Sequence, residues 1–157
     1  MERSAVLRGA MLLRDFTEVG LKILAESTVE RSVSAGAYAF RAGEPSEALA
    51  IVARGTLQLV PTDGGSPVGE VTAGDSLGGL SLLVDGERVL SAVALDEVEL
   101  LELSRDAFEE IKKSHPRTAL KLTLCLAQDL AERLREARAP LREFLAWQVG
   151  KQQAEGR

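Results

Sequence analysis

The chain has 157 residues, of which 45% are hydrophobic and 27% charged, and its net charge at pH 7 is −5. This balance is typical of a soluble protein with one domain, or with one domain and a helical extension. No apolar run reaches the roughly 20 residues of a membrane-spanning helix, and the acidic charge disfavours nucleic acid as an obligatory partner. A single cysteine, Cys125, excludes an internal disulfide framework. We therefore expect a cytoplasmic protein without a membrane contact.

The first 26 residues have the spacing of helices. Apolar residues recur every three or four positions from residue 6 to 13 and again from 19 to 24, which predicts two short helices. Thr17 can begin the second helix because its hydroxyl can accept a hydrogen bond from a free backbone N–H.

Residues 28–104 consist of short apolar stretches separated by turns. Glycine and proline interrupt them at intervals of about 8–12 residues, as in the segments 42–45 and 61–67. Many short strands with such turns are typical of a β-sandwich or a β-barrel.

Helical spacing returns over residues 105–150. Ser104 can cap a first helix, and Pro116 separates that helix from a long one over about 117–139. A last short helix is expected over 141–149, followed by a frayed tail over 151–157.

The long helix carries two apolar stripes and therefore needs two surfaces to cover them. The first stripe consists of Leu122, Leu126 and Leu130. The second stripe consists of Leu120, Leu124, Ala127, Ala131 and Leu134. A parallel helix of a second subunit can cover the second stripe, since the small alanines permit close approach. Other helices of the same chain can also cover it, so both alternatives stay open, and a homodimer is our working expectation.

Residues 74–88 have the layout of a small anion pocket. A strand end leads through Gly74, Gly78 and Gly79 into a short helical turn, and Arg88 follows. Glycines let backbone N–H groups approach an anion closely. An arginine adds a forked, permanently charged partner for phosphate oxygens.

Together these features resemble the cyclic-nucleotide-binding domain of the catabolite-activator and kinase-regulatory-subunit family. The resemblance covers about residues 12–138 and depends on the order and spacing of its segments. The segments are 36–44, 52–55, 74–88, 103–108 and 130–134. The resemblance implies a mainly β domain over 1–157: an eight-stranded, jelly-roll-like β-roll (a double-stranded β-helix) with N-terminal helices and a long C-terminal helix.

The resemblance also implies a set of ligand-binding residues. These are Gly78, Gly79, Leu80, Ser81, Arg88 and Val89. In such domains the arginine and helix N–H groups hold the cyclic phosphate, and a glutamate accepts the ribose 2′-hydroxyl. Here Gly79 stands at the glutamate position, nine residues before Arg88, and Val89 replaces the small or hydroxylated residue that follows the arginine.

The loss of the glutamate weakens the expected grip on a nucleotide. A hydroxyl-to-carboxylate hydrogen bond contributes roughly 1.5–3 kcal/mol, about one to two decades of affinity. We therefore expect a non-enzymatic regulatory or signalling module that acts through protein–protein interaction and has a degenerate pocket and no cofactor. The alternative is a genuine sensor of cAMP, cGMP or another nucleotide, in which ligand at Arg88 moves the C-terminal helices.

Other chemistry has little support in the sequence. One histidine, His115, and one cysteine give no metal-ligand spacing, and no carboxylates form a recognisable acid/base pair. We expect Ser76 and Ser81 to be turn and helix-cap residues. Gene activators of the resembled family carry a helix-turn-helix after the long helix. The residues after Pro140 are too few for one, so we expect no direct DNA binding by the chain as it stands.

Overall fold

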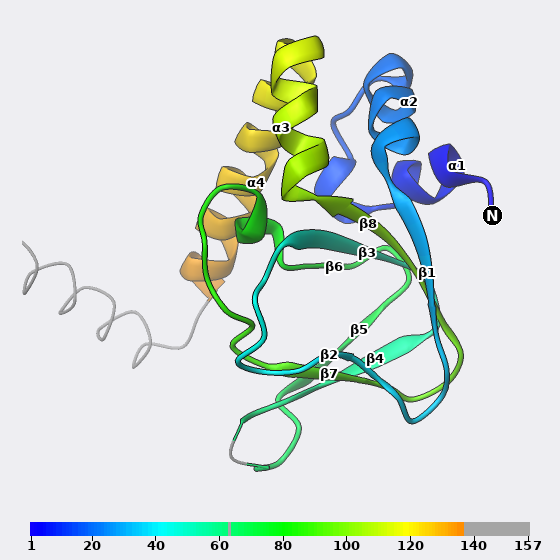
Figure 1. Cartoon of the computed structure of the whole chain (residues 1–157), viewed down its shortest axis with the longest axis vertical. Helices are drawn as coiled ribbons and strands as arrows, with labels where there is room; N and C mark the ends of the chain where they lie inside the picture. Colours follow the sequence, from blue (N-terminus) through cyan, green and yellow to red (C-terminus); the bar gives the residue numbers. More distant parts are fainter. Residues whose placement is uncertain (63, 137–157) are drawn as a thin grey trace, which may run out of the picture.

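The computed structural model describes residues 1–62 and 64–136. Two antiparallel sheets of four strands each form a roll, and helices cover the outer side of one sheet (Figure 1). This arrangement confirms the predicted β-roll with flanking helices. The predicted helix over 141–149 and the tail over 151–157 lie outside the described residues, and the assignment of 1–157 to a single domain stays a prediction.

The two sheets differ in what they contact. The first sheet has the order β1 (Val29–Val33), β8 (Val98–Ser104), β3 (Ala48–Arg54) and β6 (Ser76–Leu77). The second sheet has the order β2 (Tyr38–Phe40), β7 (Ser91–Ala94), β4 (Thr56–Val60) and β5 (Gly69–Thr72). The first sheet packs against the helices on one face and against the second sheet on the other.

Strand β3 shows how one strand serves two cores. Successive side chains of a strand point to opposite faces. Leu49 and Ile51 therefore join the core beneath the helices, whereas Ala50 and Val52 join the core inside the roll. All four side chains are buried, so this strand reads as a continuous apolar run in the sequence.

The helices begin and end at sequence signals. Those before the roll are α1 (Arg3–Arg8), a 3-10 turn η1 (Met11–Leu13) and α2 (Glu18–Ser27); α3 (Arg105–Ser114) and α4 (Pro116–Glu136) follow it. Thr17 accepts a hydrogen bond from Gly20 N at 3.1 Å, and Ser104 accepts one from Ala107 N at 3.0 Å. Both predicted caps are confirmed. Among the described residues no helix is both long and apolar enough to cross a membrane.

The first predicted helix is shorter than its periodicity suggests. Helix α1 ends at Arg8, and Ala10 is extended because the N–H of Met11 donates to the carbonyl of Gly74 at 3.0 Å. This contact ties the segment to the turn between β5 and β6. Helical spacing alone could not reveal a contact with a residue so distant in sequence.

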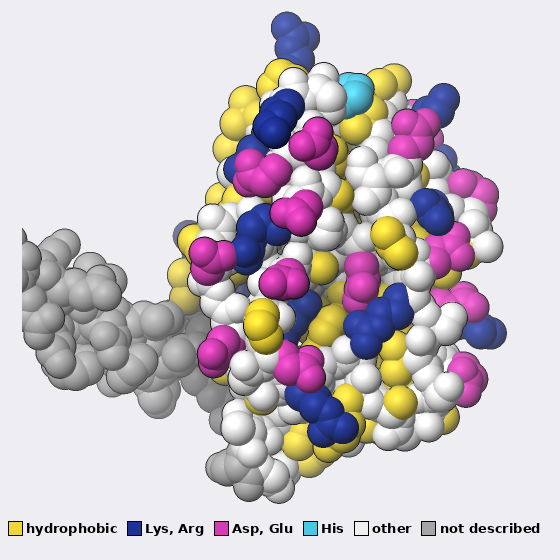
Figure 2. Space-filling view, in the orientation of Figure 1, with side chains coloured by type: hydrophobic (Ala, Val, Ile, Leu, Met, Phe, Trp, Pro, Cys, Tyr) yellow, Lys and Arg dark blue, Asp and Glu magenta, His cyan; other side chains and the backbone are white. Residues whose placement is uncertain are grey.

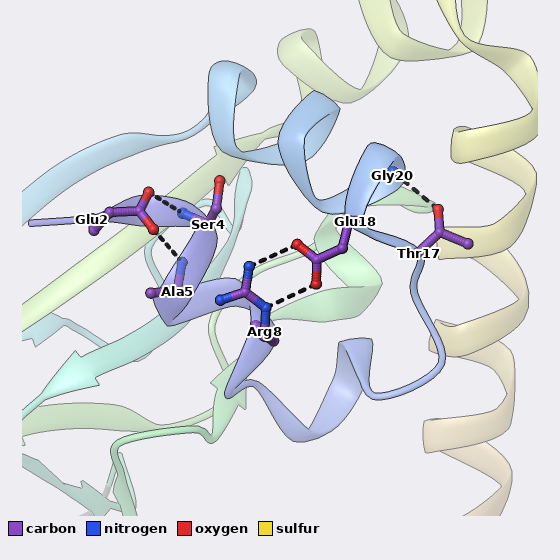
Figure 3. A network of polar contacts seen from close by, with 7 residues as sticks. All are labelled: Glu2, Ser4, Ala5, Arg8, Thr17, Glu18 and Gly20. Carbon is purple, nitrogen blue, oxygen red and sulfur yellow. Dashed lines mark hydrogen bonds and ion pairs between the residues drawn. The ribbon is translucent and has the colours of Figure 1, made fainter.

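Polar contacts hold the two N-terminal helices together (Figure 3). Glu2 accepts hydrogen bonds from the first backbone N–H groups of α1, and the guanidinium of Arg8 forms two hydrogen bonds with the carboxylate of Glu18, at 2.7 and 2.9 Å. The latter bonds raise the pKa of Arg8 and lower the pKa of Glu18. These contacts fix α1 beside α2 on the outer side of the first sheet.

Helix α4 presents one predicted stripe to the protein and the other to solvent. Leu122 and Leu126 are buried in the core beneath the helices, whereas Leu130, the third member of this stripe, is 37% exposed. In the second stripe, Leu120 and Leu124 are 59% and 58% exposed. The alternative in which another helix of the chain covers the second stripe depends in part on the predicted helix over 141–149, which lies outside the described residues, and it stays a prediction. Hydrophobic side chains gather along the edge of the molecule formed by α4 (Figure 2).

Candidate ligand pocket

A cavity of about 420 Å³ lies between the roll and α4. Its walls come from β6, the 3-10 turn η2 (Gly79–Leu82), the following segment 84–90 and one face of α4, with Phe40 and Leu59 from the second sheet. In Figure 1 the segment that contains η2 runs beside α4. The volume falls in the range of about 300–1,000 Å³ typical of small-molecule sites.

Arg88 is held inside this cavity by its backbone and by its side chain. The N–H of Arg88 donates to the carbonyl of Glu44, and its own carbonyl accepts from Gly43 N, both at 2.8 Å. Its Nη2 donates to the carbonyl of Ala48 at 3.1 Å, and its Cζ lies 3.9 Å from the centre of the Phe40 ring. A guanidinium stacked on an aromatic face is favourable, so the Phe40 ring stabilises the cation in this position.

Gly78 gives the guanidinium its space. Its φ is +72°, a left-handed conformation that side chains disfavour. A Cβ here would lie 2.1 Å from Nη1 of Arg88 and 2.8 Å from the carbonyl oxygen of Ala48. Any residue other than glycine would push the arginine out of its present position.

Gly79 faces helix α4 instead. A Cβ at this position would lie 2.6 Å from Cδ2 of Leu126, a buried residue of that helix. The missing side chain thus allows α4 to pack closely against η2, which we call the pocket turn. A glutamate at position 79 could be accommodated only if Leu126 moved.

Arg88 brings a cation to a cavity whose other charged side chains are Asp85, Glu87, Asp129 and Arg133. Among the described residues, Arg88 takes part in no ion pair, whereas Asp129 pairs with Arg133 at 2.9 Å and Asp85 pairs with Arg105. Burial lowers the pKa of the Arg88 guanidinium, and the charge of the more distant Glu102 offsets only part of this decrease. A half-buried cation without an ion-pair partner is stabilised by an anion.

A second arginine, Arg105, fixes the shape of the pocket. Its side chain donates to the carbonyls of Ser81 at 2.6 Å, Val84 at 3.0 Å and Ser46 at 3.1 Å, and it also pairs with Asp85. It therefore clamps η2 and the segment after it to the chain before β3. No local sequence pattern marks this role, because the acceptors are mostly backbone carbonyls distant in sequence.

The prediction for the two serines was wrong. Ser76 lies within β6 rather than in a turn, and Ser81 lies inside η2, which has no side-chain cap. Both are buried, and the hydroxyl of Ser81 shares a hydrogen bond with the hydroxyl of Ser46. Ser81 therefore joins the pocket turn to the loop before β3.

All six residues predicted from the resemblance line the cavity. They are Gly78, Gly79, Leu80, Ser81, Arg88 and Val89. Leu80 and Val89 are exposed at its rim, and Ser81 is buried. Their contact with a ligand stays a prediction. Sequence reasoning missed Phe40, Leu126 and Arg105.

The residues of the second stripe do not line the cavity, although α4 contributes to both surfaces. The pocket side of α4 carries Leu126, Asp129, Leu130 and Arg133. In the part of the chain that the structure describes, no three His, Cys, Asp or Glu side chains gather as a metal site.

Comparisons with known proteins agree with the fold. The profile of a family described as "Cyclic nucleotide-binding domain" matches residues 30–115. The N-terminal domain of a transcriptional regulator from Streptomyces coelicolor A3(2) is 27% identical, with a TM-score of 0.74 over 85% of this chain and 97% of that one. The Catabolite Activator Protein of Thermus thermophilus is 30% identical, with a TM-score of 0.71 over 86% of this chain and 62% of that one.

A curated relative is much longer than this chain. The lysophospholipase nte1 of Neurospora crassa is 35% identical over 98 residues, which make up 60% of this chain and 6% of the fungal protein. The match therefore spans a small part of that enzyme.

Proposed function

We propose that this chain, which belongs to the cyclic nucleotide-binding domain family, is a non-enzymatic regulatory module of the cytoplasm that acts through contact with a protein partner. The exposed apolar stripe on α4 carries this proposal. Of its three leucines, Leu120 and Leu124 are more than half exposed and Leu134 is 39% exposed. Exposing apolar surface to water is unfavourable in free energy, and a contiguous apolar patch typically marks an interface.

The position of the stripe suits regulation. One face of α4 lines the pocket and another face carries the stripe, so a shift of this helix would change both surfaces together. The partner that fits best is the same stripe of a second copy, because Ala127 and Ala131 let two helices approach closely. The likeness to a lysophospholipase covers 6% of that enzyme and gives no support for transferring its activity.

Multi-angle light scattering of the full chain tests this proposal. We expect the mass of a dimer, and we expect Leu124→Glu to yield a monomer, because a carboxylate in the apolar contact would lose its hydration. Lys121→Gln is the matched control, since it changes the charge by the same amount at an exposed position of the same helix outside the stripe. A monomeric unaltered chain, or a dimer that tolerates Leu124→Glu, would remove the homodimer.

A cyclic-nucleotide sensor is the second candidate function. The cation of Arg88, unpaired among the described residues and set in a cavity walled by α4, favours it. Bound cAMP would then slow amide hydrogen exchange in η2 and α4, and Arg88→Ala would abolish the effect. Unchanged exchange at saturating nucleotide would speak against a sensor.

A further inference from the structure

We propose that the cavity beside Arg88 binds a small amphiphilic anion, with a carboxylate or phosphate head on the guanidinium and a hydrocarbon body along the wall formed by α4. This inference goes beyond the proposed function, because contact with a partner protein does not require a ligand.

The head group is specified by Arg88. Its guanidinium has five N–H donors, and among the described residues it gives one hydrogen bond, to the carbonyl of Ala48. Phe40 and Gly78 hold the planar group in place. A fixed fork of unused donors suits two oxygens of a carboxylate or a phosphate.

The body is specified by the remaining walls. Six large aliphatic side chains surround the cavity: Leu59, Leu77, Leu80, Leu90, Leu126 and Leu130. They come from both sheets, from η2, from the segment 84–90 that follows it and from α4. An apolar cavity of this size stabilises hydrocarbon that leaves water.

The polar groups of the lining do not suit a sugar. The hydroxyls of Ser46 and Ser81 bond to each other, and the carboxylates of Asp85 and Asp129 are bound to arginines. Position 79 has no side chain, and Leu126 of α4 lies against it. Of the other polar side chains of the lining, Glu87 is exposed and Ser76 is buried. A buried ribose would therefore lack the carboxylate acceptor that a glutamate at position 79 would supply, whereas an alkyl chain needs none.

Isothermal titration calorimetry of the full chain tests the proposal with a matched ligand series. The ligands are octanoate, octyl phosphate, 1-octanol, acetate and inorganic phosphate, all below micellar concentrations. We expect octanoate or octyl phosphate to bind at least about tenfold more tightly than octanol, acetate or inorganic phosphate. The ratio between the two amphiphiles identifies the preferred head.

Two variants locate the site. Arg88→Gln should weaken the tighter amphiphile at least about tenfold, because its fixed cation is lost. Arg54→Gln, which removes an exposed cation that is paired with Glu99 and does not line the cavity, should change the affinity little. If Arg88→Gln does not fold, as judged by circular dichroism, the ligand series on the unaltered chain decides.

Several outcomes would overturn the proposal. Octanol binding as tightly as octanoate and octyl phosphate would show that the cation is not used. Acetate or inorganic phosphate binding as tightly as the amphiphiles would show that the apolar wall is not used. Absence of saturable binding, or tighter binding of cAMP, would also reject it. None of these results changes the mass measured by light scattering, so failure here is separable from failure of the proposed interface.

Discussion

At the residue scale, the position of Arg88 depends on two neighbours from other parts of the chain. Phe40 supports the guanidinium from β2, and Gly78 leaves room for it between β6 and η2. The cation is thus held where a ligand would meet it, although burial lowers its pKa. Its placement is a property of the fold and not of the segment that contains it.

Replacing Gly78 by alanine should therefore cost more than its backbone conformation alone. Gly36 is the matched control, since its φ is +83° and a Cβ there would meet nothing within 4 Å. We expect Gly36→Ala to lower the free energy of unfolding by about 1–2 kcal/mol, and Gly78→Ala to lower it by a further ~1–3 kcal/mol because Arg88 must move. Urea denaturation measures both, and equal losses would contradict the close contact.

The single thiol should be unreactive in the folded chain. Cys125 is buried on α4, and burial raises the pKa of its thiol. A raised pKa lowers the thiolate fraction at every pH below it, and thiolate is the reactive form. We expect a disulfide reagent at pH 8 to label the native chain at least about tenfold more slowly than the urea-unfolded chain. Comparable rates would show that this part of α4 opens freely.

At the scale of elements, α4 is placed by a missing side chain. Leu126 packs where a Cβ of residue 79 would lie, and Leu122 anchors the same face in the core. The departure from the family pattern at Gly79 therefore has two consequences. It removes the carboxylate that would accept a ribose hydroxyl, and it brings an apolar helix face to the cavity.

A double-mutant cycle checks this contact. Gly79→Ala should lower the free energy of unfolding by about 1–3 kcal/mol through overpacking against Leu126. In the background of Leu126→Ala the same change should cost at least ~1 kcal/mol less, because the space is then free. Gly86→Ala is the control, since a Cβ there meets nothing within 4 Å. Additive effects at 79 and 126 would contradict the contact.

The clamp formed by Arg105 joins three elements: η2, α3 and the loop before β3. Its hydrogen bonds are charge-assisted and partly buried, and such bonds contribute more than neutral ones. We expect Arg105→Leu to lower the free energy of unfolding by about 2–3 kcal/mol and to speed amide exchange over 79–85. Arg54→Leu, which breaks the exposed pair with Glu99, should cost less than about 1 kcal/mol. Unchanged exchange in the pocket turn would reject the clamp.

At the scale of the whole molecule, the sequence predicted what depends on local pattern. The local sequence predicts three features: the turn-separated strands, the caps at Thr17 and Ser104, and the glycine at position 79. Each depends on a pattern within a few residues. The break after Arg8, the support from Phe40 and the packing of Leu126 were not, because each depends on a contact between distant segments. The prediction for the serines failed for the same reason, because Ser81 bonds to Ser46 and Ser76 pairs with Ile51 of β3.

The molecule as a whole has the cation of Arg88 but lacks a carboxylate at position 79 that could bind a sugar. Its roll places Arg88 in a cavity, while Gly79 offers no acceptor to a ribose hydroxyl. The loss is worth roughly 1.5–3 kcal/mol, or one to two decades of affinity. We propose that the family fold is kept here with a pocket that can still bind an anion through Arg88.

Calorimetric titration of the full chain with cAMP and cGMP tests this account most directly. It predicts no micromolar binding of either nucleotide, whether Arg88 is present or replaced by alanine. Micromolar binding that disappears in Arg88→Ala would contradict it, because the pocket would then hold the sugar without the glutamate.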